Sequence, residues 1–452
     1  MNPEFRRQLT LELTPSRLVL MPSILLLLGA CAYLLETNVP LKNLHDGALL
    51  IMGLLGAGVG AFTALGSIND EINERTWDQQ RMSALGPWPM AWGKLLGGPS
   101  YAWYGVLLCA VVALVSSFML GHGGRSSKLV FLGVLGIATL HCGLMASRLF
   151  GMNPSKPSST RSTWGLVILL LFLLQMLSGV FFGIEEIFEP QQQIRWWGWG
   201  LPPTPLMLVF AVLFLLLGLL ALWRAMAMQL SVPTTPWAWV LGNTALCLLL
   251  AGLLPEATAR VLAILFLLML ATYYAAVIEN QVAQRWRTVL YSLRHGQWRR
   301  FWQNLPLWPI SWGMAFVVLL PAYILWNADP LAARDQLGPF MLMVLLHVLR
   351  DCGVYLFFAL RNNARSPLGM TVLVLFVLGA ILPAMFWSAG LAPLFEPLFG
   401  IFSGKLYASM RNVPALGWLA WIGMLLQLAA LAAALVWRFR QLMPSNDSRS
   451  WP

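Results

Sequence analysis

The chain has 452 residues, of which 58% are hydrophobic and only 10% are charged, and its formal net charge is +11. A soluble protein of this length carries about a quarter charged residues, so the composition excludes an ordinary water-soluble enzyme or binding domain. It predicts an all-α, polytopic membrane protein, in which the basic balance reflects membrane topology and does not indicate a nucleic-acid partner.

Apolar segments follow one another along the whole chain. Each is long enough to cross a hydrocarbon core of about 30 Å as a helix, so membrane lipid is an expected partner. About twelve spans are predicted, at residues 18–35, 48–68, 101–120, 128–147, 163–183, 203–223, 236–254, 259–278, 308–326, 338–360, 367–388 and 415–436. Most Lys and Arg residues fall in the loops and tails that are cytoplasmic if the N-terminus lies inside. This predicts a bacterial inner (plasma) membrane protein with both termini in the cytoplasm.

The first long polar connection, residues 69–105, leaves the second span. Asp70, Glu74 and Asp78 recur at intervals of four, which predicts one acidic stripe on a cytosolic helix that Pro87 terminates. A solvated loop helix is one interpretation. Water alone does not require the tryptophans of this segment, so we expect a soluble protein to dock there; they are Trp77, Trp88 and Trp92.

A second polar segment, residues 278–313, repeats features of the first at a constant spacing. Further matches in the same order extend over the whole chain; the matched residues are Trp77/Trp286, Ser83/Ser292, Trp103/Trp312, Cys142/Cys352, Glu189/Glu396, Pro205/Pro414 and Trp223/Trp437. We interpret the chain as two six-span repeats, 1–228 and 229–452. Because six is even, both repeats face the same way, which predicts a parallel pseudo-twofold axis along the membrane normal.

The outer connection between the fifth and sixth spans of each half is rich in aromatic residues, proline and acids. Its acidic residues are Glu185, Glu186 and Glu189 in the first half and Glu396 in the second. Tryptophans in such a position suit the lipid headgroup layer, which favours a pair of interfacial helices. The alternative is a lid or re-entrant hairpin that closes a path on the outer face.

Ionisable residues inside the spans are rare and therefore candidates for a substrate or gating contact. They are His141 in the fourth span and His347, Arg350 and Asp351 in the tenth. Arg350 and Asp351 are adjacent and should point about 100° apart. A structural polar contact between helices is the alternative. The five cysteines all lie in apolar spans without a CxxC pair or a Cys/His cluster, so we expect neither a disulfide framework nor a metal site.

One stretch of the first polar segment resembles the permease subunits of ABC-2-type transporters. The residues that carry this resemblance are Glu71, Glu74-Arg75-Thr76-Trp77-Asp78, Ser83-Ala84-Leu85, Pro87 and Gly93-Lys94-Leu95-Leu96. The resemblance implies a coupling helix in a cleft of a separate ATP-binding subunit. By that analogy the contact residues are Glu71, Glu74, Thr76, Trp77, Asp78 and Lys94, to which we add Asp70 and, in the second half, Trp286.

The second half departs from this pattern. Trp302-Gln303 stands where Gly93-Lys94 stood, and its polar helix is basic where the first is acidic. The two helices are therefore expected to dock unequally. Arg75 also occupies a position where the family has glycine.

No GxxxxGK[ST] phosphate loop is present, so ATP and Mg²⁺ are expected on a partner ATPase, present as two copies or a dimer. No catalytic residue is expected in this chain. The favoured hypothesis is a transport subunit, an exporter by family analogy. A secondary active transporter of parallel-repeat type and a membrane transferase are the alternatives. A secondary transporter usually needs buried carboxylates, and a transferase needs catalytic acids or metal ligands. The sequence offers few residues of either kind. The substrate stays open.

Overall fold

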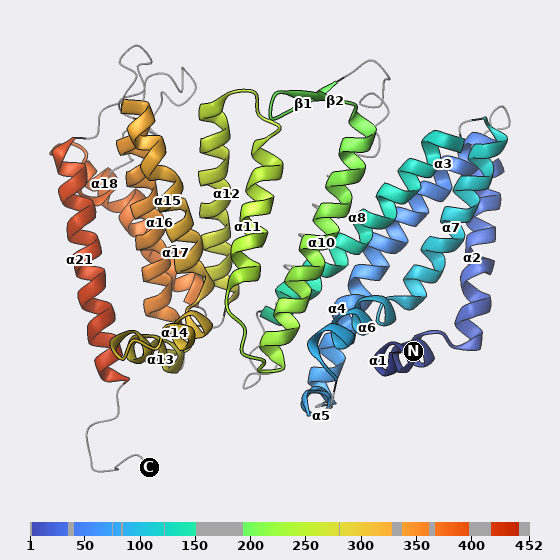
Figure 1. Ribbon diagram of the computed structural model, residues 1–452, viewed down its shortest axis with the longest axis horizontal. Coiled ribbons are helices and arrows are strands. Elements are labelled where there is room, and N and C mark those ends of the chain that lie inside the picture. The colour runs from blue at the N-terminus through green and yellow to red at the C-terminus, as the bar shows by residue number, and fades with distance from the viewer. Residues whose placement is uncertain are drawn as a thin grey trace. The chain divides into compact units, whose positions relative to one another are not determined.

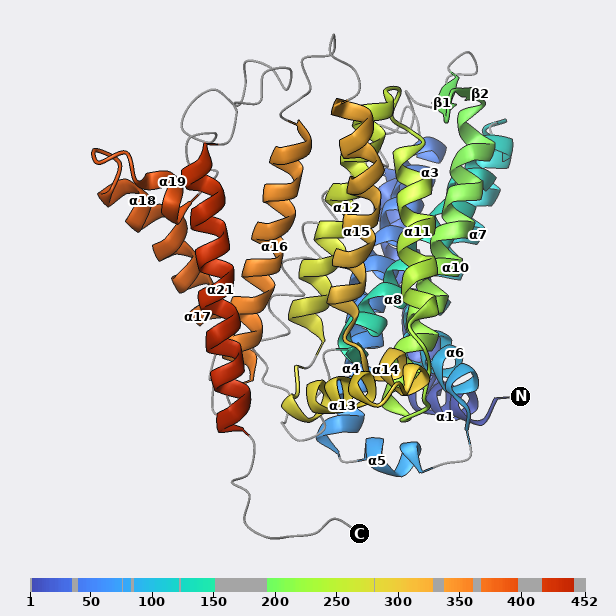
Figure 2. The ribbon, with the colours of Figure 1, turned by 60° about the vertical axis from the view of Figure 1, so that its left-hand side comes forward.

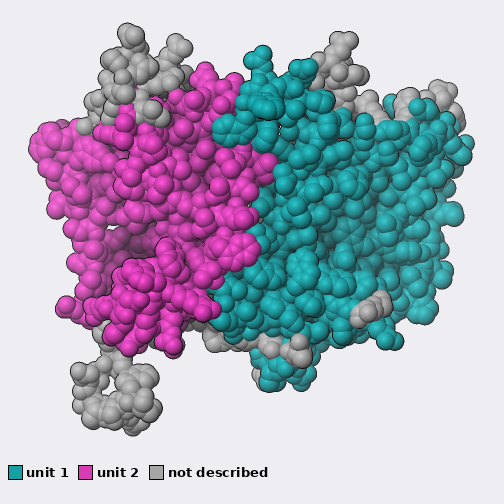
Figure 3. Space-filling view, viewed as in Figure 1, with its two compact units in different colours: residues 1–234 teal, residues 235–452 magenta. Residues whose placement is uncertain are grey.

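The computed structural model describes residues 2–34, 40–74, 76–82, 85–121, 123–150, 193–279, 281–327, 337–360, 367–396 and 417–442. The chain separates into two compact units, Met1–Thr234 and Thr235–Pro452 (Figure 3). Helices make up nearly all of the described chain, and the regular strands form one short hairpin.

The prediction of an all-α, multi-pass membrane protein is confirmed at this level. Within the described residues, ten helices are long and apolar enough to cross a membrane. They are Pro15–Leu34, Pro40–Ile72, Ser100–Met119, Ser126–Phe150, Pro203–Gln229, Ala257–Ile278, Leu307–Ile324, Leu337–Ala359, Pro367–Met385 and Trp418–Gln441. The predicted span 236–254 is a shorter apolar helix, Trp237–Ala251, and the predicted span 163–183 lies outside the described residues. Twelve spans in two repeats therefore stay a prediction.

Unit 1 consists of long apolar helices with three short helices at one end, where the N-terminus also lies (Figure 1). Its elements are α1 (Pro3–Glu12), α2 (Pro15–Leu34), α3 (Pro40–Gly53), the π-helix η1 (Leu54–Gly60), α4 (Ala61–Asn73), α5 (Thr76–Arg81), α6 (Pro87–Gly97), α7 (Ser100–Met119), α8 (Gly123–Phe150), β1 (Ile194–Trp196), β2 (Trp199–Leu201) and α10 (Pro203–Gln229). The end formed by α1, α5 and α6 is called the base of unit 1 below.

The core of unit 1 lies between α3, α7 and α8. Met52, Val106 and Ala113 are completely buried there and pack with small and branched apolar side chains. In contrast, α2 buries little of its surface, and large side chains such as Leu26 (74% exposed) point outward. A soluble protein would not leave such an apolar face in water, whereas lipid covers it without cost.

The outer connection of unit 1 ends in a β-hairpin, which the interpretation as a pair of interfacial helices did not include. β1 and β2 pair in antiparallel register, with Trp196 opposite Trp199. The two-residue turn, Trp197-Gly198, has positive φ at both positions (52° and 87°). This geometry matches the twist of a hairpin, and glycine adopts it without steric cost.

Unit 2 also consists of apolar helices, with two short polar helices at one end. Its described elements are α11 (Trp237–Ala251), α12 (Ala257–Ile278), α13 (Ala283–Arg294), α14 (Trp298–Asn304), α15 (Leu307–Asn327), α16 (Leu337–Ala359), α17 (Pro367–Phe376), the π-helix η2 (Val377–Ile381), α18 (Leu382–Met385), α19 (Ala392–Phe395) and α21 (Trp418–Gln441). α13 and α14, between the end of α12 and the start of α15, form the base of unit 2 (Figure 1). Met343 of α16 and Met424 of α21 are fully buried against each other's helices.

Candidate functional site

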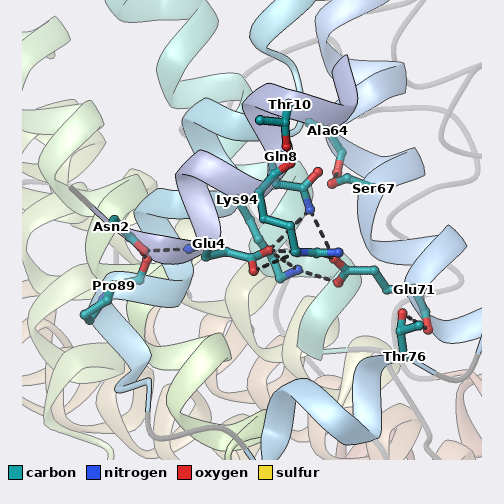
Figure 4. Close-up of polar contacts among 11 residues, drawn as sticks. Asn2, Glu4, Gln8, Thr10, Ala64, Ser67, Glu71, Thr76, Pro89 and Lys94 are labelled. Carbon is teal, nitrogen blue, oxygen red and sulfur yellow. Dashed lines mark hydrogen bonds and ion pairs between the residues drawn. The ribbon is translucent and has the colours of Figure 1, made fainter. Parts of the chain in front are cut away.

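The base of unit 1 is held together by three buried charges and one exposed charge, that of Arg7, which come from three elements. Lys94 of α6 is completely buried and contacts both Glu4 of α1, at 2.9 Å between Nζ and Oε1, and Glu71 of α4. Arg7 of α1 bridges the same two carboxylates and lies 3.1 Å from Glu4 Oε1. These four residues, called the basal network below, contain two positive and two negative charges (Figure 4).

Local sequence explains why α1 lies against α6. Asn2 caps α1 by accepting the Glu4 backbone N–H at 3.0 Å, and its side-chain amide donates to the carbonyl of Pro89 at the start of α6. A methyl group at Gly93 would come within 3.0 Å of Glu4 Cβ, and one at Gly97 within 2.6 Å of Gln8 Cβ. Glycines at these two positions therefore let α1 approach the backbone of α6, which brings Lys94 within reach of Glu4.

The charges of the basal network affect one another's protonation. Burial alone would raise the pKa of Glu4, but the hydrogen bond from Arg7 and the positive charge of Lys94 outweigh burial and lower the pKa to about 2. The same contacts raise the pKa of Arg7, although burial opposes that shift. Gln8 adds neutral donors, at 3.2 Å from Glu4 Oε1 and 3.1 Å from Glu71 Oε1. Glu4 is thus ionised and Arg7 is protonated at neutral pH.

The predicted docking residues divide into two groups. Glu71, Trp77 and Lys94 are at most 5% exposed, and the Lys94 ammonium lies 5.4 Å from the centre of the Trp77 ring. The docking prediction for these three stays untested, and the geometry gives each of them a contact inside the unit. Asp70, Glu74 and Asp78, in contrast, are exposed.

The expected continuous acidic helix is interrupted. α4 ends at Asn73 and α5 begins at Thr76, so the acidic stripe is shared between two helices. The Thr76 hydroxyl donates to the Glu71 carbonyl at 3.2 Å, and such side-chain bonds compete with the helical backbone bond. Gly86 and Pro87 then start α6, with Pro87 at its first position, as expected of a proline that cannot continue a preceding helix.

The base of unit 2 is built around one buried carboxylate. Glu279 is 4% exposed, pairs with Arg285 at 2.5 Å and accepts the backbone N–H of Leu307 at 2.7 Å, where α15 begins. Arg285 also donates to the carbonyls of Asn304 and Leu305. Trp286, the predicted counterpart of Trp77, is half-buried and packs on Trp308 with ring centres 6.1 Å apart.

A second charged cluster lies on α16 within unit 2. His347 Nε2 is 2.7 Å from Glu396 Oε1, and Arg350 Nη1 is 3.5 Å from Glu396 Oε2. Arg350 also pairs with Asp351 at 3.0 Å, although adjacent residues were expected to point apart, because its long side chain reaches back. We call these four residues the α16 network. Two uncharged partners complete it: Gln427 of α21 and Tyr273 of α12.

His141, the remaining candidate of the predicted intramembrane pathway, is a buried core histidine of unit 1. Its Nε2 lies 2.9 Å from the carbonyl of Gly56 in the π-helix η1, and its ring meets Trp103 edge-on at 5.3 Å. A methyl group at Gly60 would be 2.8 Å from the ring. The structure thus places His141 in a different unit from His347, Arg350 and Asp351.

Sequence reasoning missed several partners. Glu396 was assigned to the outer connection, yet it joins the α16 network. Gln427 lies in an otherwise apolar span, a signal that could have identified it as an intramembrane contact. Glu4 and Arg7, spaced i, i+3 after the Asn-Pro helix start, could have suggested a fixed helix. The predicted outer residues Glu185, Glu186 and Glu189 lie outside the described residues.

Comparison with protein-family models, with curated proteins and with solved structures finds no match for this chain. Its function is therefore argued below from its own residues.

Proposed function

We propose that this chain is the membrane-spanning permease subunit of an ATP-driven transporter of ABC-2 type, coupled to a separate ATP-binding subunit at the base of unit 1. What supports this proposal is the pairing of a rigid base with exposed acids. The basal network fixes α1, α4 and α6, and Asp70, Glu74 and Asp78 are presented outward beside it. A coupling element must transmit force, so it needs such a rigid connection to the helices that follow.

In this proposal the buried residues of the base hold its helices in position, and the exposed acidic residues bind the ATPase. Trp77 anchors α5 beneath Lys94, and Glu71 ties the end of α4 to α6. A displacement of α5 by the ATPase would therefore reach α4 and α6 together. ATP and Mg²⁺ would lie on the partner, and both termini on its side of the membrane.

The test is copurification of the tagged full chain from its native host in mild detergent, with identification of P-loop ATPases by mass spectrometry. The amount of ATPase that copurifies with the variant Asp70→Lys/Glu74→Lys/Asp78→Lys should be at least tenfold lower than with the wild type. Asp46→Lys, an exposed acid on α3 away from the base, is the matched control and should retain it fully. Undiminished capture by the triple variant would refute the docking surface.

Charge reversal on the base of unit 2 should have the smaller effect. Arg294, Arg299 and Arg300 are exposed and suitable for this comparison. Arg285 is unsuitable, because it holds Glu279 and its loss would disturb the fold.

A secondary active transporter is the second candidate, and one observation favours it. Such proteins couple transport to buried ionisable groups, and Glu396 adds a second carboxylate to Asp351 in the α16 network. If no ATPase copurifies with the wild type from several detergents and from nanodiscs, this candidate replaces the first.

A further inference from the structure

The α16 network connects a long apolar helix to a short segment that returns against it. The segment comprises α19 and Glu396, and it packs on α21 so closely that a methyl group at Gly423 would be 2.2 Å from the Leu394 carbonyl oxygen. Gln427 donates to the carbonyls of Leu394 (3.1 Å) and Phe395 (2.7 Å), which end α19. Figure 2 shows α18 and α19 beside α21. Irregular backbone among membrane helices needs such partners.

The hydrogen-bond partners of His347 fix the number of protons that His347 and Glu396 share. Its Nδ1 lies 2.8 Å from the carbonyl oxygen of Met343, which can only accept, so Nδ1 must carry a hydrogen. Its Nε2 lies 2.7 Å from Glu396 Oε1, and an ionised carboxylate also only accepts. Neutral imidazole has a single N–H. The two contacts together therefore require one further proton, on Nε2 or on Glu396.

The charges around the pair agree with this requirement. With His347 protonated, each carboxylate of the α16 network has a cationic neighbour among these four residues. Of the described groups facing it, α12 contributes Tyr273, whose hydroxyl donates to Asp351 Oδ2 at 2.8 Å, and α16 itself contributes the thiol of Cys352. α17, η2 and α18 carry no titratable side chain, α15 has Tyr323 beside Gly338, and α21 adds the amide of Gln427.

We propose that His347 and Glu396 form a proton-binding site, and that the bound proton latches residues 392–396 against α16. When this proton leaves for water, the bond from Nε2 to hydrogen breaks and its electron pair stays on Nε2. Two lone pairs, on Nε2 and on the carboxylate, then face each other, and the segment is released. This inference holds whether ATP or an ion gradient drives the protein.

The proton itself can be observed in the full chain reconstituted in lipid nanodiscs. The chain has five histidines, so ¹⁵N-histidine NMR is tractable, with His347→Gln identifying the His347 signals. At pH 7 we expect either an imidazolium at position 347 or, by infrared difference spectroscopy, a carboxylic acid that Glu396→Gln removes. A neutral His347 beside an ionised Glu396 at pH 7 would overturn the proposal.

The latch is tested by hydrogen–deuterium exchange of the amides of residues 391–396 at pH 6 and pH 9. Glu396→Gln keeps the hydrogen bond, because its amide donates to neutral Nε2, but needs no extra proton. Amide exchange is base-catalysed and becomes faster with pH in both proteins. Dividing the wild-type exchange rate by the variant rate removes this common pH dependence. The resulting ratio should be near one at pH 6 and rise at least tenfold at pH 9; His347→Gln should behave like Glu396→Gln.

Glu256→Gln is the matched control, because Glu256 is exposed at the start of α12 and takes no part in the α16 network. Its exchange should equal that of the wild type at both pH values. A ratio for Glu396→Gln and His347→Gln that does not change with pH would show that the contact is a structural hydrogen bond, and the latch would be refuted.

Discussion

The basal network of unit 1 and the α16 network of unit 2 are built from similar side chains but differ in one consequential group. In the first, the cationic side chains that face Glu4 and Glu71 are an arginine and a lysine, Arg7 and Lys94. In the second, one of the two cationic positions is His347, whose charge depends on a proton. A histidine changes charge near neutral pH, whereas arginine and lysine do not. The first network therefore lacks a group of this kind, whereas the second contains the pair that we propose to bind a proton.

The largest expected effect comes from removing a permanent charge from the basal network. Lys94→Met leaves two buried carboxylates with one cation, and breaking a buried ion pair in this way costs about 3–5 kcal/mol. Thermal unfolding in detergent should show a large drop in midpoint. Lys42→Met, at an exposed lysine of α3, is the control and should change little. Equal midpoints for both variants would show that the network does not hold the base together.

Acid should open the basal network only at low pH. Because the folded-state pKa of Glu4, about 2, lies below its ordinary value of 4.5, its contribution to stability is present above pH 4.5 and is lost as the pH falls toward 2. The shift corresponds to about 3 kcal/mol. The amides of α1 should exchange more slowly in the wild type than in Glu4→Gln above pH 4.5. The two exchange rates should become equal near pH 2. Equal protection at pH 7 in both proteins would contradict this.

The amide of Gln427, a neutral partner of the α16 network, should contribute less to stability than a buried charge. Gln427→Leu leaves the carbonyls of Leu394 and Phe395 and the guanidinium of Arg350 without this amide, at a cost of about 1–3 kcal/mol. Exchange of residues 391–396 should rise at both pH 6 and pH 9, in contrast to the pH-dependent effect of the proton. Gln229→Leu, an amide of unit 1 bonded to a single carbonyl, is the matched control, and it should leave exchange of this segment unchanged.

The smallest effect is expected at the base of unit 2. Glu279→Gln retains one acceptor oxygen for the Leu307 N–H but turns its NH2 group toward Arg285. Because Arg285 is 21% exposed, water can replace the lost partner, so we expect about 1 kcal/mol. The loss of unfolding midpoint in this variant is compared with the loss in Lys94→Met. The comparison tests whether a single ion pair stabilises its unit less than a network of four charged residues. A loss equal to that of Lys94→Met would contradict the distinction between the two bases.

The amino-acid sequence was sufficient to predict a multi-pass membrane protein and the position of its polar segments. Apolar length and scarce charge are properties of the chain, so the membrane helices follow from hydrophobic transfer without knowledge of packing. It also identified Asp70, Glu74 and Asp78, which are exposed, and the rarity of His347, Arg350 and Asp351 in a span. The interruption between α4 and α5 was missed, because a hydroxyl contact from Thr76 is not visible in periodicity.

Which charged side chains contact one another depends on how the helices pack. Glu4 and Lys94 are far apart in the sequence and join because Gly93 and Gly97 admit α1. Glu396 appeared to belong to an outer connection, and the return of α19 along α21 brings it to His347. An ion pair or a shared proton depends on atoms within a few ångströms of each other. Composition and periodicity fix which face of a helix is polar, but helix packing fixes which polar groups come within that distance.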